Sequence, residues 1–524
     1  MHEGILYLIN AISKSLKNLR KLELSFVSCP NIDDKGAGYI RCLIFQRLRN
    51  LEKLSLNFSP LTSDISGRET VPFEVNIIQR LQTRNAFLNG NDYIQINNMT
   101  LKGSLLFYST ISQYLHNIRE FTVIIPPIIS KCDYGKDIID SVIPRLVRLR
   151  KLHFSFYNME DSEIEELSEC IGKKLPAQLQ YLTLEITGSA VEEETLRNLT
   201  ANILLNLPRL CGFGLNIRGL KDNISYQFLY QIILLICLHG KRLESLTLSF
   251  VPIEGVNHQV IKKLIDKLSQ DLNRLEELTL NFQESYDDSK MTASISHQPT
   301  FDSLKKLRLY LCDYDPSPLV SYKNLVELTL LFADCSKMSD SNFEQLLLKI
   351  SDLKGLRYLS LQFAEASLIT DKAFTQLLLT KWHTNRFSAL KHLSFGISMN
   401  RNLTNKSVGD LSHWSCENLK ELTHLEVIFM SCRGISETGI VFFLRTIAKN
   451  LKKLESLALD FFQSGIVSEI TLNNMADAIV KHLNGLRKLS MTLTTQENVK
   501  PDFILQIRRK LRFIPVLDLY YSNY

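Results

Sequence analysis

The stretch LESLTLSF, at residues 243–250, contains the pattern that decides the fold. Nearly the same letters return as LEELTLNF at 275–282 and as LESLALDF at 454–461. In each copy apolar residues occupy positions 1, 4, 6 and 8, and the last three of them alternate with polar residues. Alternation with a period of two is typical of a β-strand that buries one face. The eight-residue motif therefore predicts a strand that returns at a regular interval.

The motif recurs along nearly the whole chain, most often about 32 residues apart, and a period of this size indicates a stacked repeat architecture. The legible copies begin at Leu19, Leu51, Ile118, Leu149, Leu179, Leu210, Leu243, Leu275, Leu304, Leu325, Leu356, Leu390, Leu422, Leu454, Leu486 and Ile514.

Two intervals depart from this spacing. The step from Leu51 to Ile118 is twice the usual one, which predicts an irregular, enlarged repeat at 59–117 with a degraded strand at 93–96. The shortest interval predicts a short repeat at 304–325, and two prolines within it exclude a full helix. We therefore expect the helical layer to break at this short repeat.

Between copies of the motif the apolar period changes from 2 to 3.6, which indicates a helix. One helical face collects Ile261, Leu264, Ile265, Leu268 and Leu272. Ser436 precedes another such stripe, at the place of a helix N-cap. Each repeat is therefore a strand, a turn, a helix and a loop that leads to the next strand. One unit is too small to bury both its strand face and its helix stripe, so neighbouring units must stack.

These units predict a single α/β solenoid over residues 1–524, with about 16–17 repeats. Crossovers between parallel strands are right-handed, so the stack should curve, with a parallel sheet on the concave side and helices on the convex side. Burial of the four apolar residues in each strand, at about 1.5–3 kcal/mol each, explains why the motif is kept so strictly.

The motif resembles a leucine-rich repeat, and its spacing with a full helix resembles the ribonuclease-inhibitor-like class. Cys29, Cys335 and Cys432 each stand three positions after the last apolar residue of a motif, which resembles the cysteine-containing class. The asparagine usual at this turn is mostly missing, and Phe often closes the motif instead. The resemblance implies a leucine-rich-repeat solenoid. Such arrays serve many different partners.

Composition limits the class of protein. The 524 residues are 45% hydrophobic and 22% charged, which suits a long core. The net charge of +6, from 61 basic and 55 acidic residues, is too small to indicate nucleic acid or a membrane surface. No run of about 18 apolar residues and no signal peptide occurs. Ten cysteines without a CxxC pair indicate reduced thiols, so we expect an intracellular, cytoplasmic protein.

Motifs for catalysis and cofactor binding are absent. The sequence contains no GxxxxGKS/T, GxGxxG, HExxH or GxSxG. His413 and Cys416 have a spacing that suits two metal ligands, but no second pair accompanies them. His153, His392 and His424 lie at outward-facing strand positions, and we interpret them as surface residues too many repeats apart to form a catalytic set. We therefore expect no enzyme activity, catalytic residue, cofactor, metal or small-molecule substrate.

The remaining candidate is the polar surface of the inner sheet, at positions 2, 3, 5 and 7 of the motif. Small hydroxyl and amide residues fill most of positions 5 and 7, and larger charged or aromatic residues interrupt them. Tyr and Arg are often decisive in protein interfaces. The residues proposed to bind a partner are Arg308, Tyr310, Arg357, Tyr358, Glu276 and Glu277. The alternative is that long charged side chains simply flank each strand at these positions.

We interpret the chain as a non-enzymatic protein-binding or scaffold module whose partners are one or more proteins. One alternative is a subunit of a larger assembly, including a cytoskeletal one. A second is an adaptor or substrate receptor of a ubiquitin ligase, although no F-box precedes the first repeat. A third is a GTPase-activating regulator, which requires a catalytic arginine that the sequence does not single out.

The first residues form an apolar helical stripe with no strand motif before it. The stripe consists of Ile5, Leu6, Leu8, Ile9 and Ile12. Solenoids need capped ends, so we expect a partner, or a preceding part of a longer chain, to cover this stripe. At the other end Pro515 suits a final edge strand, because proline lacks the N–H that would pair further.

Overall fold

The computed structural model describes a set of ranges and a few single residues. They are 18–25, 50–57, 117–124, 143–157, 159–187, 191–218, 224–254, 258–284, 301–311, 322–333, 335–379, 387–495 and 501–523, with residues 7, 11, 12, 15, 16, 48 and 139. These residues belong to two compact units, Met1–Thr292 and Ala293–Tyr524. Each unit repeats a strand that is followed, in most repeats, by a helix.

The first unit has a parallel sheet and a layer of helices. Its strands are β1 (Lys21–Ser25), β2 (Lys53–Asn57), β3 (Glu120–Ile124), β4 (Lys151–Tyr157), β5 (Tyr181–Thr187), β6 (Gly212–Arg218), β7 (Ile224–Ser225), β8 (Ser245–Glu254) and β9 (Glu277–Glu284). They pair in the order β1-β2-β3-β4-β5-β6-β8-β9, and β7 adds a short second pair to β8. Its helices are the 3-10 turn η3 (Ile143–Arg145), α6 (Asp161–Lys174), α7 (Glu193–Asn206), α8 (Tyr226–His239) and α9 (His258–Asp271).

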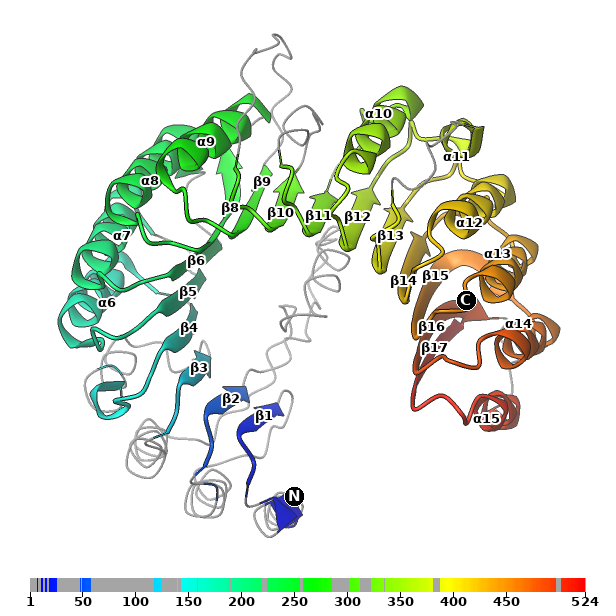
Figure 1. Ribbon diagram of the computed structural model, residues 1–524, viewed down its shortest axis with the longest axis horizontal. Helices are drawn as coiled ribbons and strands as arrows, with labels where there is room; N and C mark the ends of the chain where they lie inside the picture. The colour runs from blue at the N-terminus through cyan, green and yellow to red at the C-terminus, as the bar shows by residue number, and fades with distance from the viewer. Residues whose placement is uncertain are drawn as a thin grey trace. The chain divides into compact units, whose positions relative to one another are not determined.

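The second unit follows the same plan. Its strands are β10 (Lys306–Leu311), β11 (Glu327–Phe332), β12 (Tyr358–Ala364), β13 (His392–Ser398), β14 (His424–Met430), β15 (Ser456–Val467), β16 (Lys488–Thr495) and β17 (Val516–Asn523), all paired in parallel and in sequence order. Its helices are α10 (Asp340–Ser351), α11 (Asp371–Leu379), α12 (Asn405–Asn418), α13 (Glu437–Asn450), α14 (Glu469–His482) and α15 (Pro501–Lys510). Within each unit the strands follow the inner side of an arc and the helices its outer side (Figure 1).

Neighbouring strands pair so that equal motif positions lie side by side. Leu246 lies opposite Leu278, and Phe250 lies opposite Phe282. All four side chains are at most 1% exposed, and the two phenylalanine rings stack with their centroids 6.3 Å apart. The buried face of the sheet is therefore a set of continuous apolar ladders. Together with the helical layer, these ladders confirm the predicted α/β leucine-rich-repeat solenoid.

The irregular intervals are only partly described. Strand β2 pairs directly with β3, and the strand expected at 93–96 lies outside the described residues. Residues 58–116, which make up nearly all of the enlarged repeat, lie outside the described part of the chain, as does the proline-containing segment 312–321 of the short repeat. Of the N-terminal stripe only Ile12 is described. The single solenoid over 1–524 and the covered N-terminal stripe stay predictions.

The turn after each strand has a characteristic position, three residues after the end of the motif, that is filled by different side chains. In consecutive repeats of the second unit this residue is Cys335, Ala366, Asn400, Cys432 and Ser464. Asn400 is fully buried, and its side-chain amide donates to the backbone carbonyls of Ala366 and, at 2.9 Å, of Ile369. The one asparagine in this series therefore binds the turn of the preceding repeat, and smaller or softer side chains fill the same place elsewhere.

Cysteines at this turn position are structural. Cys335 is 3% exposed and Cys432 is fully buried. The Cys432 thiol donates to the carbonyl of Ile397 at 3.6 Å, and burial raises the pKa of this thiol to about 12. A thiol with such a pKa stays protonated and is a poor nucleophile. Cys29 lies outside the described residues, and membership of the ribonuclease-inhibitor-like or cysteine-containing class stays a prediction.

A second repeated contact joins neighbouring helices at their first turns. The first residue of one helix accepts a hydrogen bond from the backbone N–H just before the next helix. These latches are Asp161–Glu192, Glu193–Ser225, Asp340–Thr370, Asp371–Thr404, Asn405–Ser436 and Glu437–Ser468, with N···O distances of 2.7 to 3.1 Å. Ser436 is the N-cap residue of α13, as predicted, but its hydroxyl accepts from the Asn405 amide rather than from its own helix.

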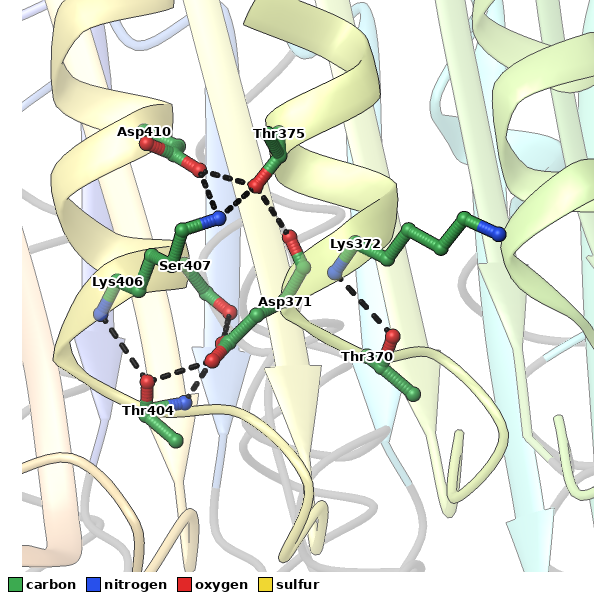
Figure 2. A network of polar contacts seen from close by, with 8 residues as sticks. All are labelled: Thr370, Asp371, Lys372, Thr375, Thr404, Lys406, Ser407 and Asp410. Atoms are coloured by element: carbon green, nitrogen blue, oxygen red, sulfur yellow. Dashed lines mark hydrogen bonds and ion pairs between the residues drawn. The ribbon is translucent and has the colours of Figure 1, made fainter.

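Figure 2 shows the latch between α11 and α12. One carboxylate oxygen of Asp371 accepts the Thr404 N–H at 2.9 Å, and the other accepts the Thr404 hydroxyl at 2.6 Å. The Ser407 hydroxyl also donates to Asp371. Burial alone would raise the pKa of the Asp371 carboxyl, but the hydrogen bonds from Ser407 and Thr404 hold it below its usual value. The charge also suits the N-terminal end of its own helix.

Replacing Asp371 with Ala should lower the free energy of unfolding by about 1–3 kcal/mol, because three donors lose a charged acceptor. Urea unfolding of the purified chain measures this loss. The lowered folded-state pKa means that the contribution is present above the ordinary value of 3.8 and is lost as the pH falls through the folded-state value. Lys372→Ala is the matched control, since its side chain points away from the network (Figure 2). Equal effects of the two variants would contradict the latch.

Candidate functional site

The sheet face opposite the helices carries positions 3, 5 and 7 of the motif in parallel rows. Because the strands pair in register, residues at equal positions become neighbours. In the second unit the position-3 row begins Lys306, Glu327, Tyr358, His392 and His424, and the position-5 row begins Arg308, Thr329, Ser360, Ser394 and Glu426. Side chains that are about 30 residues apart in sequence are thus brought into contact.

Three of the predicted partner-binding residues meet at the start of these rows. Glu327 lies between two cations, with its carboxylate 3.7 Å from Lys306 Nζ and 3.7 Å from Arg308 Nη2. Burial raises the pKa of both the Tyr310 and the Tyr358 phenol, and the positive charge of Arg308 acts on both in the opposite direction. Arg308 and Tyr358 therefore lie near the Glu327 carboxylate, and Tyr310 lies near both of them.

The other three predicted residues lie elsewhere. Arg357 immediately precedes the N-terminal end of β12 and is exposed there. Glu276 and Glu277 lie at the start of β9 in the first unit. Burial raises the pKa of the Tyr181 phenol, and the charges of both glutamates add to this effect. The acidic pair and the group around Arg308 therefore belong to different units.

An aromatic row continues from Tyr358 across the next two strands. Its ring centroid lies 5.8 Å from that of His392, and His392 stacks on His424 at 3.9 Å with an interplanar angle of 17°. Burial lowers the pKa of both imidazoles, so both rings are neutral at pH 7. The expected separation by many repeats is wrong for His392 and His424, which occupy equal positions in adjacent repeats, whereas His153 lies on β4 of the first unit.

A chain of hydrogen bonds fixes the side chains next to this row. Gln362 Nε2 donates to Ser394 Oγ at 3.0 Å, and the Ser394 hydroxyl donates to Glu426 Oε2 at 2.8 Å. Gln362 and Ser394 are 4% and 6% exposed. Gly396 leaves the space that Gln362 occupies, since a Cβ at 396 would lie 1.8 Å from Gln362 Oε1. This part of the sheet face is therefore preorganised.

In the first unit the position-3 row sets one carboxylate between two lysines. Glu120 lies 3.1 Å from Lys53 Nζ and 3.3 Å from Lys151 Nζ. The Lys151 ammonium in turn lies 4.8 Å from the centroid of the Tyr181 ring, in a cation–π contact. Because these charges satisfy one another, this row is a weaker candidate for partner binding than the row from Lys306 to His424.

A metal-binding cluster does not assemble in the described residues. Within those ranges no three His, Cys, Asp or Glu side chains come close enough to hold a metal ion. His413 and Cys416 both lie on α12, where His413 packs against the Phe442 ring at 5.6 Å and the Cys416 thiol donates to the Thr446 carbonyl at 3.6 Å. In the same part of the chain no helix has the length and hydrophobicity to cross a membrane.

The chain is similar to several solved structures at low identity, while no family model and no curated protein matches it. The tropomodulin C-terminal domain from Caenorhabditis elegans shares 14% identity at a TM-score of 0.25, over 32% of this chain and 92% of that one. The TLR13–ssRNA13 complex shares 16% at 0.34, over 98% and 69%. An internalin from Listeria monocytogenes shares 16% at 0.27, over 75% and 84%. Identities and TM-scores this low support no inference of function for this chain.

Acidification should destabilise the second unit through His392 and His424. Their pKa values are lowered in the folded state from 6.5, so their contribution is present above that value and is lost as the pH falls below it. The urea concentration at the unfolding midpoint should therefore decrease as the pH is lowered from about 7.5 to about 5. The decrease should be smaller in the double variant His392→Asn/His424→Asn. His413→Asn, an exposed change on α12, is the control and should follow the wild type. Identical pH profiles for all three proteins would contradict the role of the stacked pair.

Proposed function

We propose that the chain is a non-enzymatic protein-binding module and that the sheet face of the second unit contacts the partner. The centre of this surface, named the Arg–Tyr–His patch, consists of Arg308, Tyr310, Glu327, Tyr358, His392 and His424. The observation that carries the proposal is the stacked row from Tyr358 to His424 beside Arg308. Large, rigid aromatic side chains next to an arginine are the usual energetic centres of protein interfaces.

The chemistry of the patch suits a partner segment with a carboxylate next to an apolar or aromatic side chain. Arg308 lies 3.7 Å from Glu327, which is longer than a hydrogen bond, so its guanidinium keeps donors for a partner carboxylate. The neutral, mutually stacked rings of His392 and His424 form one aromatic surface, against which an apolar or aromatic side chain can pack. A basic partner would instead meet the positive charge of Arg308 and Lys306.

Rigidity supports the same assignment. Every strand of the patch except the first is hydrogen-bonded on both sides within the second unit, and the hydrogen bonds from Gln362 to Glu426 hold the adjacent side chains in place. A surface that is already ordered loses little conformational entropy when a partner binds. Elements of the scaffold also position contact groups more accurately than loops do.

The acidic residues of the first unit are proposed as a separate contact. Glu276 and Glu277 join Glu244 in acting on the pKa of Tyr181, so three carboxylates gather near one aromatic ring.

The free thiols of the described cysteines support a reducing, cytoplasmic location. A cytoskeletal or other multi-subunit particle, a ubiquitin ligase and a small GTPase remain the partner classes to distinguish.

Affinity purification of the full chain with mass spectrometry tests the proposal. The double variant Arg308→Ala/Tyr358→Ala should lose the partner that the wild type captures, with an affinity at least about tenfold lower. The control Phe442→Ala/Arg445→Ala removes an exposed aromatic and arginine from α13, on the helix side of the same unit, and should keep that partner. Retention of the partner by the first variant, or its loss from both, would contradict the proposal. The captured protein identifies the partner class.

A further inference from the structure

Helices α13, α14 and α15 carry a group of cations at their C-terminal ends. Two basic residues of this region have a carboxylate partner, since Lys453 pairs with Glu421 and Lys510 pairs with Asp477. Six further cations of the last turns and the turns that follow are exposed and form no ion pair within the part of the chain that the structure describes. These six residues, named the basic edge, are Lys449, Lys452, Lys481, Arg508, Arg509 and Arg512.

The repeat aligns three of these cations in a row. Each of the three helices ends with the same backbone hydrogen bond, from the N–H of a leucine just after the helix to the carbonyl of an isoleucine four residues earlier. Lys449, Lys481 and Arg509 are the penultimate residues of their helices and are therefore equivalent. Neighbouring helices pack about 8–10 Å apart, so the row is roughly 20 Å long and follows one edge of the helical layer (Figure 1).

The helix dipole does not account for this row. It favours a cation near every helix C-terminus, yet the last turns of α7, α9 and α12 contain no basic residue. On α6 the penultimate residue is Lys173, which pairs with Glu169 at 2.9 Å. On the other described helices of fourteen residues outside α13 and α14, the penultimate residues are Leu205, Leu238, Gln270 and Glu417. Unpaired cations at this position are therefore a property of α13, α14 and α15.

The side chains of the basic edge lie close enough to act on one another. Burial lowers the pKa of the His482 imidazole at the end of α14, and the positive charges of three lysines lower it further. These lysines are Lys452, Lys481 and Lys449. The Lys452 ammonium also donates to the backbone carbonyls of Ala448 and His482, at 3.3 and 3.4 Å. Cations from α13, from its following turn and from α14 thus share one region.

The positive charge is local. The six cations of the basic edge carry as much charge as the net charge of the whole chain, +6. A concentrated patch of one sign raises the local concentration of an oppositely charged partner, although the average charge of the chain does not. The basic edge therefore fits an anionic partner.

Exposed apolar side chains stand among these cations. Phe513 follows Arg512 and is 40% exposed, and Val480 precedes Lys481 and is 38% exposed. Leu505 on α15 is 51% exposed. Interleaved basic and apolar side chains are typical of surfaces that lie on a membrane, where the cations contact anionic headgroups and the apolar groups enter the boundary with the acyl chains.

Other polyanions fit the basic edge less well. A nucleic-acid strand is bound by a charged groove with aromatic side chains on which its bases stack, whereas this row stands on the outer, helical side of the second unit (Figure 1). An acidic peptide offers no apolar environment to Val480 and Leu505. A planar surface, by contrast, meets helix ends that stop at equal positions.

We propose that the basic edge binds the headgroups of an anionic membrane, with the row of Lys449, Lys481 and Arg509 on the headgroup charges and Phe513 at the acyl boundary. The contact is peripheral and uses the helical layer of the second unit. The Arg–Tyr–His patch lies on the sheet face of that unit, so failure of either proposal leaves the other standing.

Co-sedimentation of the full chain with vesicles at about 0.15 M salt tests the proposal. The wild type should bind vesicles of phosphatidylcholine that contain phosphatidylserine, and should not bind phosphatidylcholine alone. Lys449→Gln/Lys481→Gln/Arg509→Gln should bind about a hundredfold more weakly, because each basic residue at an anionic leaflet contributes about fivefold. The control Arg209→Gln/Arg242→Gln/Arg274→Gln removes the same charge from exposed arginines of the first unit and should bind like the wild type. A wild type that does not bind, or equal losses in both triple variants, would overturn the proposal.

A second comparison separates a membrane from a soluble polyanion. Phe513→Ser keeps every charge and should weaken vesicle binding on the order of fivefold, since an apolar side chain no longer enters the acyl boundary. Single-stranded RNA and polyglutamate, each added at the same concentration of negative charge, should not displace the chain from the vesicles. Displacement by either polymer, together with binding of that polymer that the triple variant at Lys449, Lys481 and Arg509 loses, would assign the basic edge to it and overturn the membrane proposal.

Discussion

In-register pairing of parallel strands is the constraint on which the rest of this structure depends. It places each motif position beside the same position of the next repeat, so that a local pattern of eight residues becomes a set of ladders. A slip by one residue would turn every apolar side chain to the wrong face. The buried ladders that include Leu246 and Phe250, and the exposed row that includes Tyr358 and His392, are two results of the same register.

Polar contacts between the first turns of neighbouring helices add a second constraint, in the helical layer. The first residue of one helix binds the backbone just before the next, as Asp371 does with Thr404. The contact satisfies a donor that would otherwise have no intrahelical partner. It also fixes the spacing between helices, which apolar packing alone does not determine. Strand pairing and helix latches thus join each repeat to its neighbours in both the sheet and the helical layer. A solenoid requires such contacts, because each of its repeats touches only the adjacent ones.

The sequence alone was sufficient for the repeat, the strands and the core, because each motif is short and its apolar spacing is local. It was not sufficient for contacts between repeats. The sequence does not reveal the latches, because Asp, Glu and Asn all serve as the acceptor and no single residue type recurs. The stack of His392 on His424 could have been found, since both stand at position 3 of consecutive motifs. Arg357 and Tyr358 are adjacent in sequence, but position 2 lies just before the strand and position 3 lies on the sheet face.

The central claim is the register itself, and cross-linking of paired cysteines on the sheet face measures it most directly. Residues 392 and 424 should lie about 4.8 Å apart across neighbouring strands, whereas residue 426 lies two residues further along. With a short bifunctional thiol-alkylating reagent, His392→Cys/His424→Cys should therefore cross-link faster than His392→Cys/Glu426→Cys, by on the order of tenfold. Equal rates, or faster linkage to position 426, would show a different register and contradict the account.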